Sequence, residues 1–321
     1  MSAFQSSVSD VFRQLFQPQV PASPVPQQPP SPQADPRLVP PTNREELRRW
    51  CEQWVKVKLP AKNVCPDHQT PLDYLEYVFF EQGNSDPLVW ACRGGGKTLC
   101  GAIATLLDML FKPGIEIRIL GGSQAQAERM YEHLVRMVES KFRDQMIRSG
   151  RLSRITKTGF TFANGSRVEL LAQNESSVRG ARVQKVRCDE VDIFDKKVWE
   201  AVQLTTRSMP GSGASTVRGT IEALSTMNGP QGLMADLVRQ GKRKLFRWCI
   251  WDVIEHCTDD CQTCSLRKEC DGKAHHTEGF VPVSDVRIMR ERVSEEVWCY
   301  EVLCDKEQAT KSRGKCIVRH Y

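Results

Sequence analysis

Apolar and polar positions alternate along the chain in a way that predicts an α/β protein between residues 44 and 252. Apolar residues three or four positions apart are typical of helices, and short apolar or alternating runs are typical of strands. The pattern predicts helices over 44–57, 72–81, 97–112 and 124–142, and strands over 88–92, 115–119, 183–188, 219–225 and 245–250. Because helices and strands alternate, we expect a mostly parallel, doubly wound sheet that binds its ligand at the carboxyl ends of the strands.

One hairpin is expected to interrupt this alternation. Residues 158–171 contain two runs of strand-forming residues on either side of Asn164 and Gly165. An Asn-Gly pair supplies the positive φ angles that a tight hairpin turn needs. The segment is therefore predicted to form an antiparallel β-hairpin.

The two ends of the chain differ in composition from its middle. Ten of the 18 prolines lie between Pro18 and Pro41, among Gln, Ser and Ala, so residues 1–43 are predicted to be a disordered arm. Residues 253–321 are predicted to form a cysteine-rich, metal-binding segment. The 13 cysteines occur in a chain with no export signal and no apolar run of membrane-spanning length, which argues against a disulfide framework and against a membrane protein.

The most informative stretch is the run 88–98. An apolar strand leads into Arg-Gly-Gly-Gly-Lys-Thr, and an apolar-periodic helix follows directly, which is the context of a phosphate-binding loop. The loop departs from the usual motif in one place, because Ala91 stands where a glycine is typical. Lys97 is predicted to contact the β- and γ-phosphates of ATP, and Thr98 to bind Mg²⁺. Three consecutive glycines are predicted to bring backbone N–H groups around the phosphates: Gly94, Gly95 and Gly96.

A pair of carboxylates directly follows the predicted strand 183–188. Asp189 is predicted to hold Mg²⁺ through its water shell, and Glu190 to polarise the attacking water. The interval between Lys97 and Asp189 is typical of a P-loop NTPase of the additional-strand type, in which one further strand separates the two motifs.

Four further residues are candidates for the same site. Arginine keeps its charge and suits the charge that develops on a transferring phosphoryl group. Arg93 is a candidate to act within its own site, and Arg179 to act on the site of a neighbouring subunit. Ser225 and Thr226, at the end of the predicted strand 219–225, are expected to sense the γ-phosphate and to relay its loss.

Four cysteines are grouped near the C-terminus with the spacing C-x3-C-x2-C-x5-C. Thiolates in such a group select Zn²⁺ or an iron–sulfur cluster, and reduced cysteines without metal are the remaining alternative. A structural Zn²⁺ would stabilise a segment that is too poor in apolar residues to fold alone. The candidate ligands are Cys257, Cys261, Cys264 and Cys270.

Taken in order, these motifs resemble the ATPase domain of the large terminase subunit of tailed phages and prophages. The resemblance covers about residues 60–255. It implies ATP hydrolysis coupled to the translocation of double-stranded DNA during packaging, with ATP and Mg²⁺ as cofactors. It also implies that Lys97 and Thr98 bind the Mg²⁺ nucleotide, that Glu190 is the catalytic carboxylate and that Arg179 is a trans-acting arginine finger.

The same resemblance implies partners and a location. Double-stranded DNA, the small terminase subunit, the portal protein ring and further copies of the chain in a homo-oligomeric ring are the expected partners. The host bacterial cytoplasm, and not the mature virion, is the expected location. The family's nuclease domain does not fit after residue 251, so no DNA cleavage is expected and the nuclease is either truncated or encoded separately.

Two other functions stay open from the sequence. Asp189-Glu190-Val191-Asp192 also fits the acidic box of a helicase-like DNA translocase. A prophage remnant that binds nucleotide or a partner without catalysis is the second alternative.

Overall fold

The computed structural model describes residues 35–142, 155–172, 178, 180, 182–210 and 216–305. The chain divides into two compact units, Met1–Pro36 and Arg37–Tyr321, and the sheet belongs to the second. Most of the predicted arm, 1–43, lies outside the described residues. Within the described part of the chain, no helix has the length and apolar character needed to cross a bilayer.

The described helices and strands follow the predicted alternation. The α-helices are α2 (Arg44–Trp50), α3 (Pro71–Phe79), α4 (Lys97–Phe111), α5 (Gln124–Met137), α8 (Lys196–Val202), α9 (Leu233–Gln240), α10 (Ile250–Val253), α11 (Arg267–Cys270), α12 (Val283–Arg292) and α13 (Glu295–Val297). Short 3-10 or π turns are η1 (Pro36–Leu38), η2 (Cys51–Val55), η3 (Val138–Phe142), η4 (Val191–Ile193), η5 (Lys273–His276) and η6 (Trp298–Val302). The strands are β1 (Pro87–Ala91), β2 (Glu116–Gly121), β3 (Gly159–Thr161), β4 (Arg167–Leu170), β5 (Lys185–Asp189), β6 (Met209–Pro210), β7 (Thr216–Val217), β8 (Thr220–Ser225) and β9 (Lys244–Trp248).

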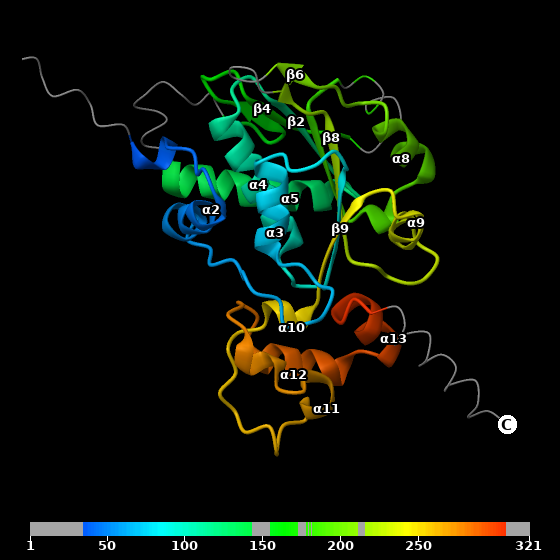
Figure 1. Cartoon of the computed structure of the whole chain (residues 1–321). Coiled ribbons are helices and arrows are strands. Elements are labelled where there is room, and N and C mark those ends of the chain that lie inside the picture. Colours follow the sequence, from blue (N-terminus) through cyan, green and yellow to red (C-terminus); the bar gives the residue numbers. More distant parts are fainter. Residues whose placement is uncertain are drawn as a thin grey trace, which may run out of the picture. The chain divides into compact units, whose positions relative to one another are not determined.

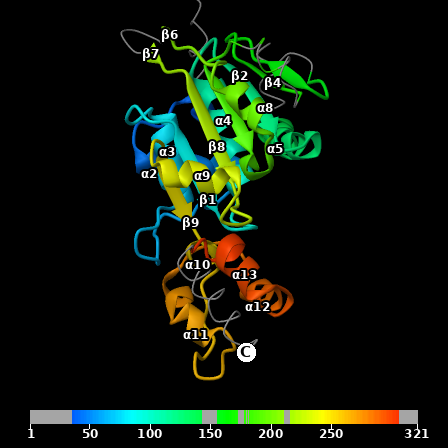
Figure 2. The ribbon, with the colours of Figure 1, turned by 90° about the vertical axis from the view of Figure 1, so that its right-hand side faces the viewer.

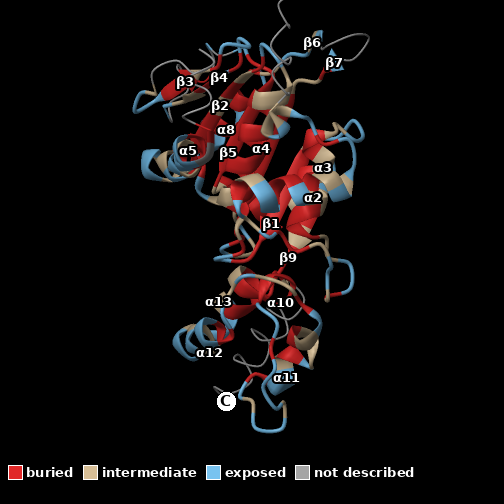
Figure 3. Cartoon of the chain, turned by 90° about the vertical axis from the view of Figure 1, so that its left-hand side faces the viewer, coloured by how far each residue is buried: buried red, intermediate tan, exposed pale blue. Residues whose placement is uncertain are grey.

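A seven-stranded sheet in the order β3-β4-β2-β5-β8-β1-β9 forms the centre of the fold (Figure 1). Its neighbouring strands are parallel, except for the antiparallel pair β3 and β4. Helices α2 to α5 cover one face and α8 and α9 the other (Figure 1). Because both faces are covered, β1, β5 and β8 are buried along their whole length (Figure 3). The predicted mostly parallel α/β sheet is confirmed.

The first predicted helix, 44–57, ends earlier than expected. Asn43 caps its start by accepting a hydrogen bond from the N–H of Glu46. The helix then continues as the π turn η2 and stops at Val55, because Lys56 adopts a left-handed conformation with φ 64°. The next helix, predicted over 72–81, is α3, which starts one residue earlier at Pro71 because Thr70 forms a capping box.

The hairpin forms, but its turn differs from the prediction. β3 and β4 pair antiparallel, and the last paired residues are Thr161 and Arg167. Gly165 has a φ of 84°, whereas Asn164 is not among the residues with positive φ. The turn is therefore not a tight two-residue Asn-Gly turn. Its five residues include the left-handed Gly165, and Asn164 instead donates a side-chain hydrogen bond to the carbonyl of Met109.

A buried group of charged and hydroxyl side chains ties α4 to the centre of the sheet. Arg187 of β5 donates two hydrogen bonds of 3.0 Å to Glu222 of β8, and it also bonds Asp108 of α4. Thr105 accepts from the same guanidinium at 3.1 Å, and the Tyr74 hydroxyl donates to Glu222 at 2.7 Å. All five side chains are buried, and the guanidinium has one carboxylate partner on a helix and another on the neighbouring strand.

The cationic partners of Asp108 lower the pKa of its carboxyl group. Burial alone would raise it, but Lys112 and Arg187 lower the pKa of Asp108 from 3.8 to about 2. Because the folded-state pKa is depressed, ionised Asp108 contributes stability fully above about pH 4 and loses that contribution as the pH falls toward 2.

The chain continues from β9 into α10 and then into the cysteine-rich segment, at the end of the sheet where β9 ends (Figure 2). Trp251 and Trp298 pack edge to face with their ring centroids 6.2 Å apart. The carbonyl of Trp248, at the end of β9, accepts hydrogen bonds from the N–H of Cys92 and from the thiol of Cys304. These contacts join the segment after residue 253 to the strand ends.

Substituting Arg187 by Met should lower the free energy of unfolding by about 3–5 kcal/mol, because the buried carboxylates of Asp108 and Glu222 would both lose the guanidinium with which they are paired. The measurement is urea unfolding at pH 7. Arg136→Met is the matched control, since the Arg136 side chain is 75% exposed and should change stability by less than about 0.5 kcal/mol. An equal effect of the two substitutions would contradict the role given to the buried guanidinium.

Candidate functional site

The glycine-rich loop connects β1 to α4, as the sequence predicts. At each of its three glycines the structure disfavours a residue with a side chain. Gly94 and Gly96 have φ angles of 76° and 78°, a region that side chains disfavour. Gly95 has an ordinary φ but no space, because an added Cβ would lie 2.7 Å from the thiol of Cys92 and 2.9 Å from its carbonyl oxygen. The Trp248 indole N–H donates to the carbonyl of Gly95 at 2.8 Å and holds the loop in place.

The loop residues face the two carboxylates predicted from the second motif. Lys97 Nζ lies 2.9 Å from Glu190 Oε1. The Thr98 hydroxyl donates to Asp189 Oδ2 at 2.8 Å. Residues that lie about 90 positions apart in the sequence therefore meet at the carboxyl ends of β1 and β5.

Glu190 occupies a strained backbone position. Its φ and ψ are 55° and 51°, which is left-handed and costs about 1–3 kcal/mol for a residue with a side chain. The conformation directs the carboxylate toward the end of β8, where Ser225 Oγ and the N–H of Thr226 both lie 3.4 Å from Glu190 Oε2. The structure thus brings together the glycine loop, the carboxylate pair and the Ser-Thr segment.

The pKa of the Asp189 carboxyl group is shifted from its ordinary value. Burial raises the pKa of Asp189 to about 6, an effect that Lys97 opposes and Glu190 reinforces. Its second oxygen, Oδ1, is buried and has no hydrogen-bond partner among the described residues. A buried carboxylate oxygen without a partner, next to the Thr98 hydroxyl, is a suitable ligand for a hard cation such as Mg²⁺.

Arg93 has a partner that the sequence did not reveal. Its guanidinium forms an ion pair of 2.6 Å with Glu301, and its backbone N–H donates to the carbonyl of Glu301 at 2.7 Å. Phe280 lies beside the same loop, with its ring 3.0 Å from the position of an added Cβ on Gly96. Glu301 and Phe280 both follow residue 253 in the chain, and no local motif marks either of them.

Arg179, the candidate trans-acting arginine, lies outside the described residues. Its role stays a prediction.

The four predicted cysteine ligands lie in the segment between α10 and the end of α11. The Cys261 thiol is 3.0 Å from His275 Nε2, and His275 Nδ1 is 2.6 Å from the carbonyl oxygen of Cys257. The quartet's other members, Cys264 and Cys270, contact Arg287 and the N–H of Ala274. In the described part of the chain, however, the group of metal-binding atoms that lie within 4.8 Å of one another is a different one: Cys65, His68, Cys249 and Asp252.

The central part of the chain is similar to a known protein family. Residues 89–223 match the family described as terminase large subunit, T4likevirus-type, N-terminal. The resemblance to large terminase subunits is confirmed. The matched segment runs from β1 into β8, so it contains the glycine loop and the carboxylate pair. No curated protein matches the chain.

Several solved terminase structures are similar to part of this chain at low sequence identity. The large terminase ATPase domain of Thermus phage P74-26 is 15% identical over 67% of this chain and 88% of that chain, with a TM-score of 0.44. The bacteriophage HK97 large terminase is 15% identical over 73% of this chain and 48% of its own, with a TM-score of 0.47. The large terminase of a thermophilic bacteriophage, in complex with ADP, is 14% identical over 54% of this chain and 44% of its own, with a TM-score of 0.40. The chain therefore spans less than half the length of the last two large terminases.

Substituting Gly95 by Ala should distort the glycine loop, because the new methyl group meets the backbone carbonyl of Cys92. We expect a loss of about 1–3 kcal/mol in the free energy of unfolding and weaker binding of a fluorescent ATP analogue. Gly229→Ala is the matched control, since an added Cβ there meets no atom within 4 Å and the φ of Gly229 is not positive. Unchanged nucleotide binding by the Gly95 variant would show that the loop does not need this close approach.

Proposed function

We propose that this chain hydrolyses ATP and couples hydrolysis to the translocation of double-stranded DNA, as the motor domain of a DNA-packaging terminase. The observation that carries the proposal is the pairing of Lys97 with Glu190 and of Thr98 with Asp189 at one edge of a parallel sheet. A P-loop lysine, a hydroxyl, an aspartate and a glutamate in this arrangement are the groups that ATP hydrolysis needs.

The sheet order supports an additional-strand P-loop ATPase. β8 lies between β1, which leads into the glycine loop, and β5, which ends in the carboxylate pair. The end of β8 therefore lies between the phosphate loop and the catalytic carboxylate. Ser225 and Thr226 both contact the Glu190 carboxylate. A movement of that carboxylate during hydrolysis would therefore shift these two residues and the chain that follows them.

Each residue has a role in the proposed reaction. The N–H groups of Gly94–Gly96 and the Lys97 side chain would bind the phosphates of ATP. Thr98 and Asp189, which are hydrogen-bonded to each other, would hold Mg²⁺, and the ion would supply positive charge to the phosphates. Glu190 orients the attacking water and accepts its proton. Lys97 also forms an ion pair with Glu190. Competition of the phosphates for Lys97 would release the carboxylate for catalysis.

The arginine that stabilises the transition state is either Arg93 or Arg179 of a neighbouring copy. Arg93 would have to exchange its contact with Glu301 for one with the phosphates. The exchange is sterically simple because the Arg93 side chain is 65% exposed. Arg179 acting between copies would require a homo-oligomeric ring.

The wider assembly follows from the family and is part of the proposal. The partners would be double-stranded DNA, the small terminase subunit and the portal ring, and the site of action would be the host cytoplasm. The net charge of +6 is compatible with a polyanionic partner.

Substituting Glu190 by Gln should abolish DNA-stimulated ATP hydrolysis and leave ATP binding intact. The amide keeps the size of the side chain but cannot accept the proton of water, so turnover should fall by at least about 100-fold. The measurement is phosphate release with and without linear double-stranded DNA, beside nucleotide binding by the same variant. Gln would occupy the same left-handed backbone position as Glu190, so the substitution adds no backbone strain. It should therefore not lower the melting temperature.

Glu200→Gln is the matched control for this experiment, since Glu200 is an exposed residue of α8. It should hydrolyse ATP at the wild-type rate. Wild-type chain that binds ATP tightly but releases no phosphate, with or without DNA, would contradict the proposed motor function.

We further propose that Cys257, Cys261, Cys264 and Cys270 bind a structural Zn²⁺, with an iron–sulfur cluster as the alternative. The position of His275 supports a metal here. Its Nδ1 is within hydrogen-bond distance of a carbonyl oxygen and its Nε2 is directed at the Cys261 thiol, which is how ligating histidines are commonly oriented.

Replacing Cys261 and Cys264 together by Ser should remove about one metal ion per chain, because two of four ligands are lost. Metal content by mass spectrometry and absorption near 400 nm are the measurements. Zinc in a colourless protein would exclude the cluster, whereas brown colour that disappears in the variant would exclude zinc. Equal metal content in the folded wild type and variant would contradict a metal at this quartet.

A further inference from the structure

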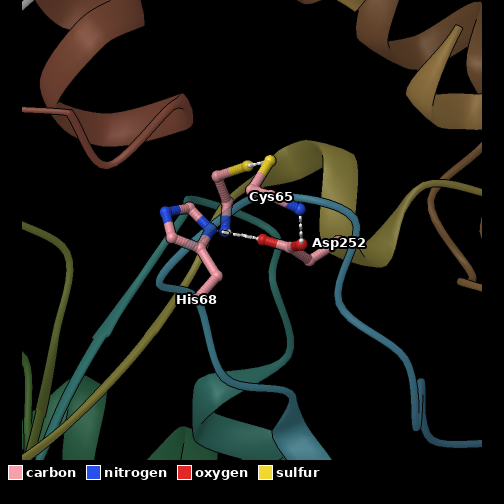
Figure 4. Close-up of side chains that lie close together, drawn as sticks. Cys65, His68 and Asp252 are labelled. Carbon is pink, nitrogen blue, oxygen red and sulfur yellow. Dashed lines mark hydrogen bonds and ion pairs between the residues drawn. The ribbon is translucent and has the colours of Figure 1, made fainter.

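Four potential metal ligands that lie far apart in the sequence converge beside the start of α10. Cys65 and His68 belong to the loop between η2 and α3, whereas Cys249 and Asp252 lie where β9 passes into α10. One ligand atom from each residue lies within 4.8 Å of the other three. Figure 4 shows the imidazole of His68 and the backbone of Cys65 beside the carboxylate of Asp252, and the sulfur of Cys65 beside a second sulfur.

Asp252 organises the two cysteines. Its Oδ1 accepts the N–H of Cys65 at 3.2 Å and the N–H of Val64 at 3.0 Å. Its Oδ2 accepts the N–H of Cys249 at 2.9 Å. A single buried carboxylate thus fixes the backbone of both cysteines, and it brings their sulfur atoms to 3.5 Å from each other. That separation is close to the distance between two thiolates on one tetrahedral Zn²⁺, which is about 3.8 Å for Zn–S bonds of about 2.3 Å.

We propose that Cys65, His68, Cys249 and Asp252 form a second metal site that binds Zn²⁺. Two thiolates, one imidazole and one carboxylate are a ligand set for a borderline-soft cation, and they do not suit Mg²⁺ or Ca²⁺. The sequence spacing agrees with the geometry, because each half of the site is a pair of ligands three residues apart, C-x2-H and C-x2-D.

The His68–Asp252 contact by itself does not account for the cluster. His68 Nδ1 lies 2.5 Å from Asp252 Oδ2, which satisfies the imidazole and the carboxylate without a metal. It leaves two thiols facing each other on segments 184 positions apart in the chain, and a cation bound beside them would account for this convergence. A cavity of about 670 Å³ is lined by Cys65, His68 and Cys249, and it provides a path for the ion.

The site would connect the loop before α3 to the strand that supports the glycine loop. Cys249 directly follows Trp248, whose carbonyl accepts from Cys92 and whose indole donates to Gly95. The proposal does not depend on the proposed ATPase function, because its test measures metal binding.

The test compares two pairs of buried cysteines in the full chain. Cys65→Ala/Cys249→Ala should contain about one zinc ion per chain less than the wild type, measured by mass spectrometry after purification without chelator. Cys51→Ala/Cys100→Ala is the matched control, because both of its thiols are buried but belong to no converging group among the described residues. The control should keep the full zinc content, so zinc at the C-terminal quartet cancels in the comparison.

A second measurement uses the wild-type chain and does not depend on the folding of a variant. Alkylation should modify Cys65 and Cys249 only after a chelator has removed zinc, as mapped by mass spectrometry. Their modification at the same rate before and after chelation would overturn the proposal. So would unchanged zinc content in a folded Cys65→Ala/Cys249→Ala variant, or a disulfide between these two cysteines in place of the metal.

Discussion

The guanidinium of Arg187 is the interaction on which the rest of the site depends. It extends from β5, in the centre of the sheet, and forms hydrogen bonds with both α4 and β8. These three elements carry the loop lysine, the carboxylate pair and the Ser-Thr segment. A shift of one of them along another would separate Lys97 from Glu190, whose atoms lie only 2.9 Å apart. Because a buried charge tolerates little loss of its partners, the network fixes the relative register of the three elements that form the site.

The groups that we propose to be catalytic could be singled out in the sequence because each of them belongs to a local pattern. A strand, three glycines, a lysine and a helix are contiguous, and so are the strand β5 and its two carboxylates. The sequence did not show how these patterns face each other. It also missed the left-handed backbone of Glu190, since nothing in the Asp-Glu pair indicates a positive φ. That conformation depends on contacts of η4 with α9 and β8, including two hydrogen bonds that the Asp192 carboxylate accepts from the chain after β8.

The sequence indicated one group of cysteines as possible metal ligands but did not indicate the other. Cys257, Cys261, Cys264 and Cys270 lie within a short segment, so their spacing alone suggested a metal. Cys65 and Cys249 each have only one partner nearby in the sequence, and the convergence of the two pairs depends on how β9 lies beside β1 and how α3 is connected. Loop closure over so many residues is entropically unfavourable, which is why the sheet has to form before such a site can exist.

Contacts of the glycine loop with later parts of the chain explain why an isolated strand–loop–helix motif is not the whole site. Trp248 holds the carbonyl of Gly95, and Glu301 holds both the backbone and the side chain of Arg93. These contacts restrict the conformations of the loop, which lowers the entropy that a ligand would have to overcome by ordering it. Arg93 is the exception, since its ion pair with Glu301 must break for the guanidinium to reach a phosphate. Because the arginine of this pair is 65% exposed, solvent screens the interaction and keeps its contribution small. The same contact can thus hold Arg93 away from the phosphates in the free chain and still yield to a polyanionic ligand.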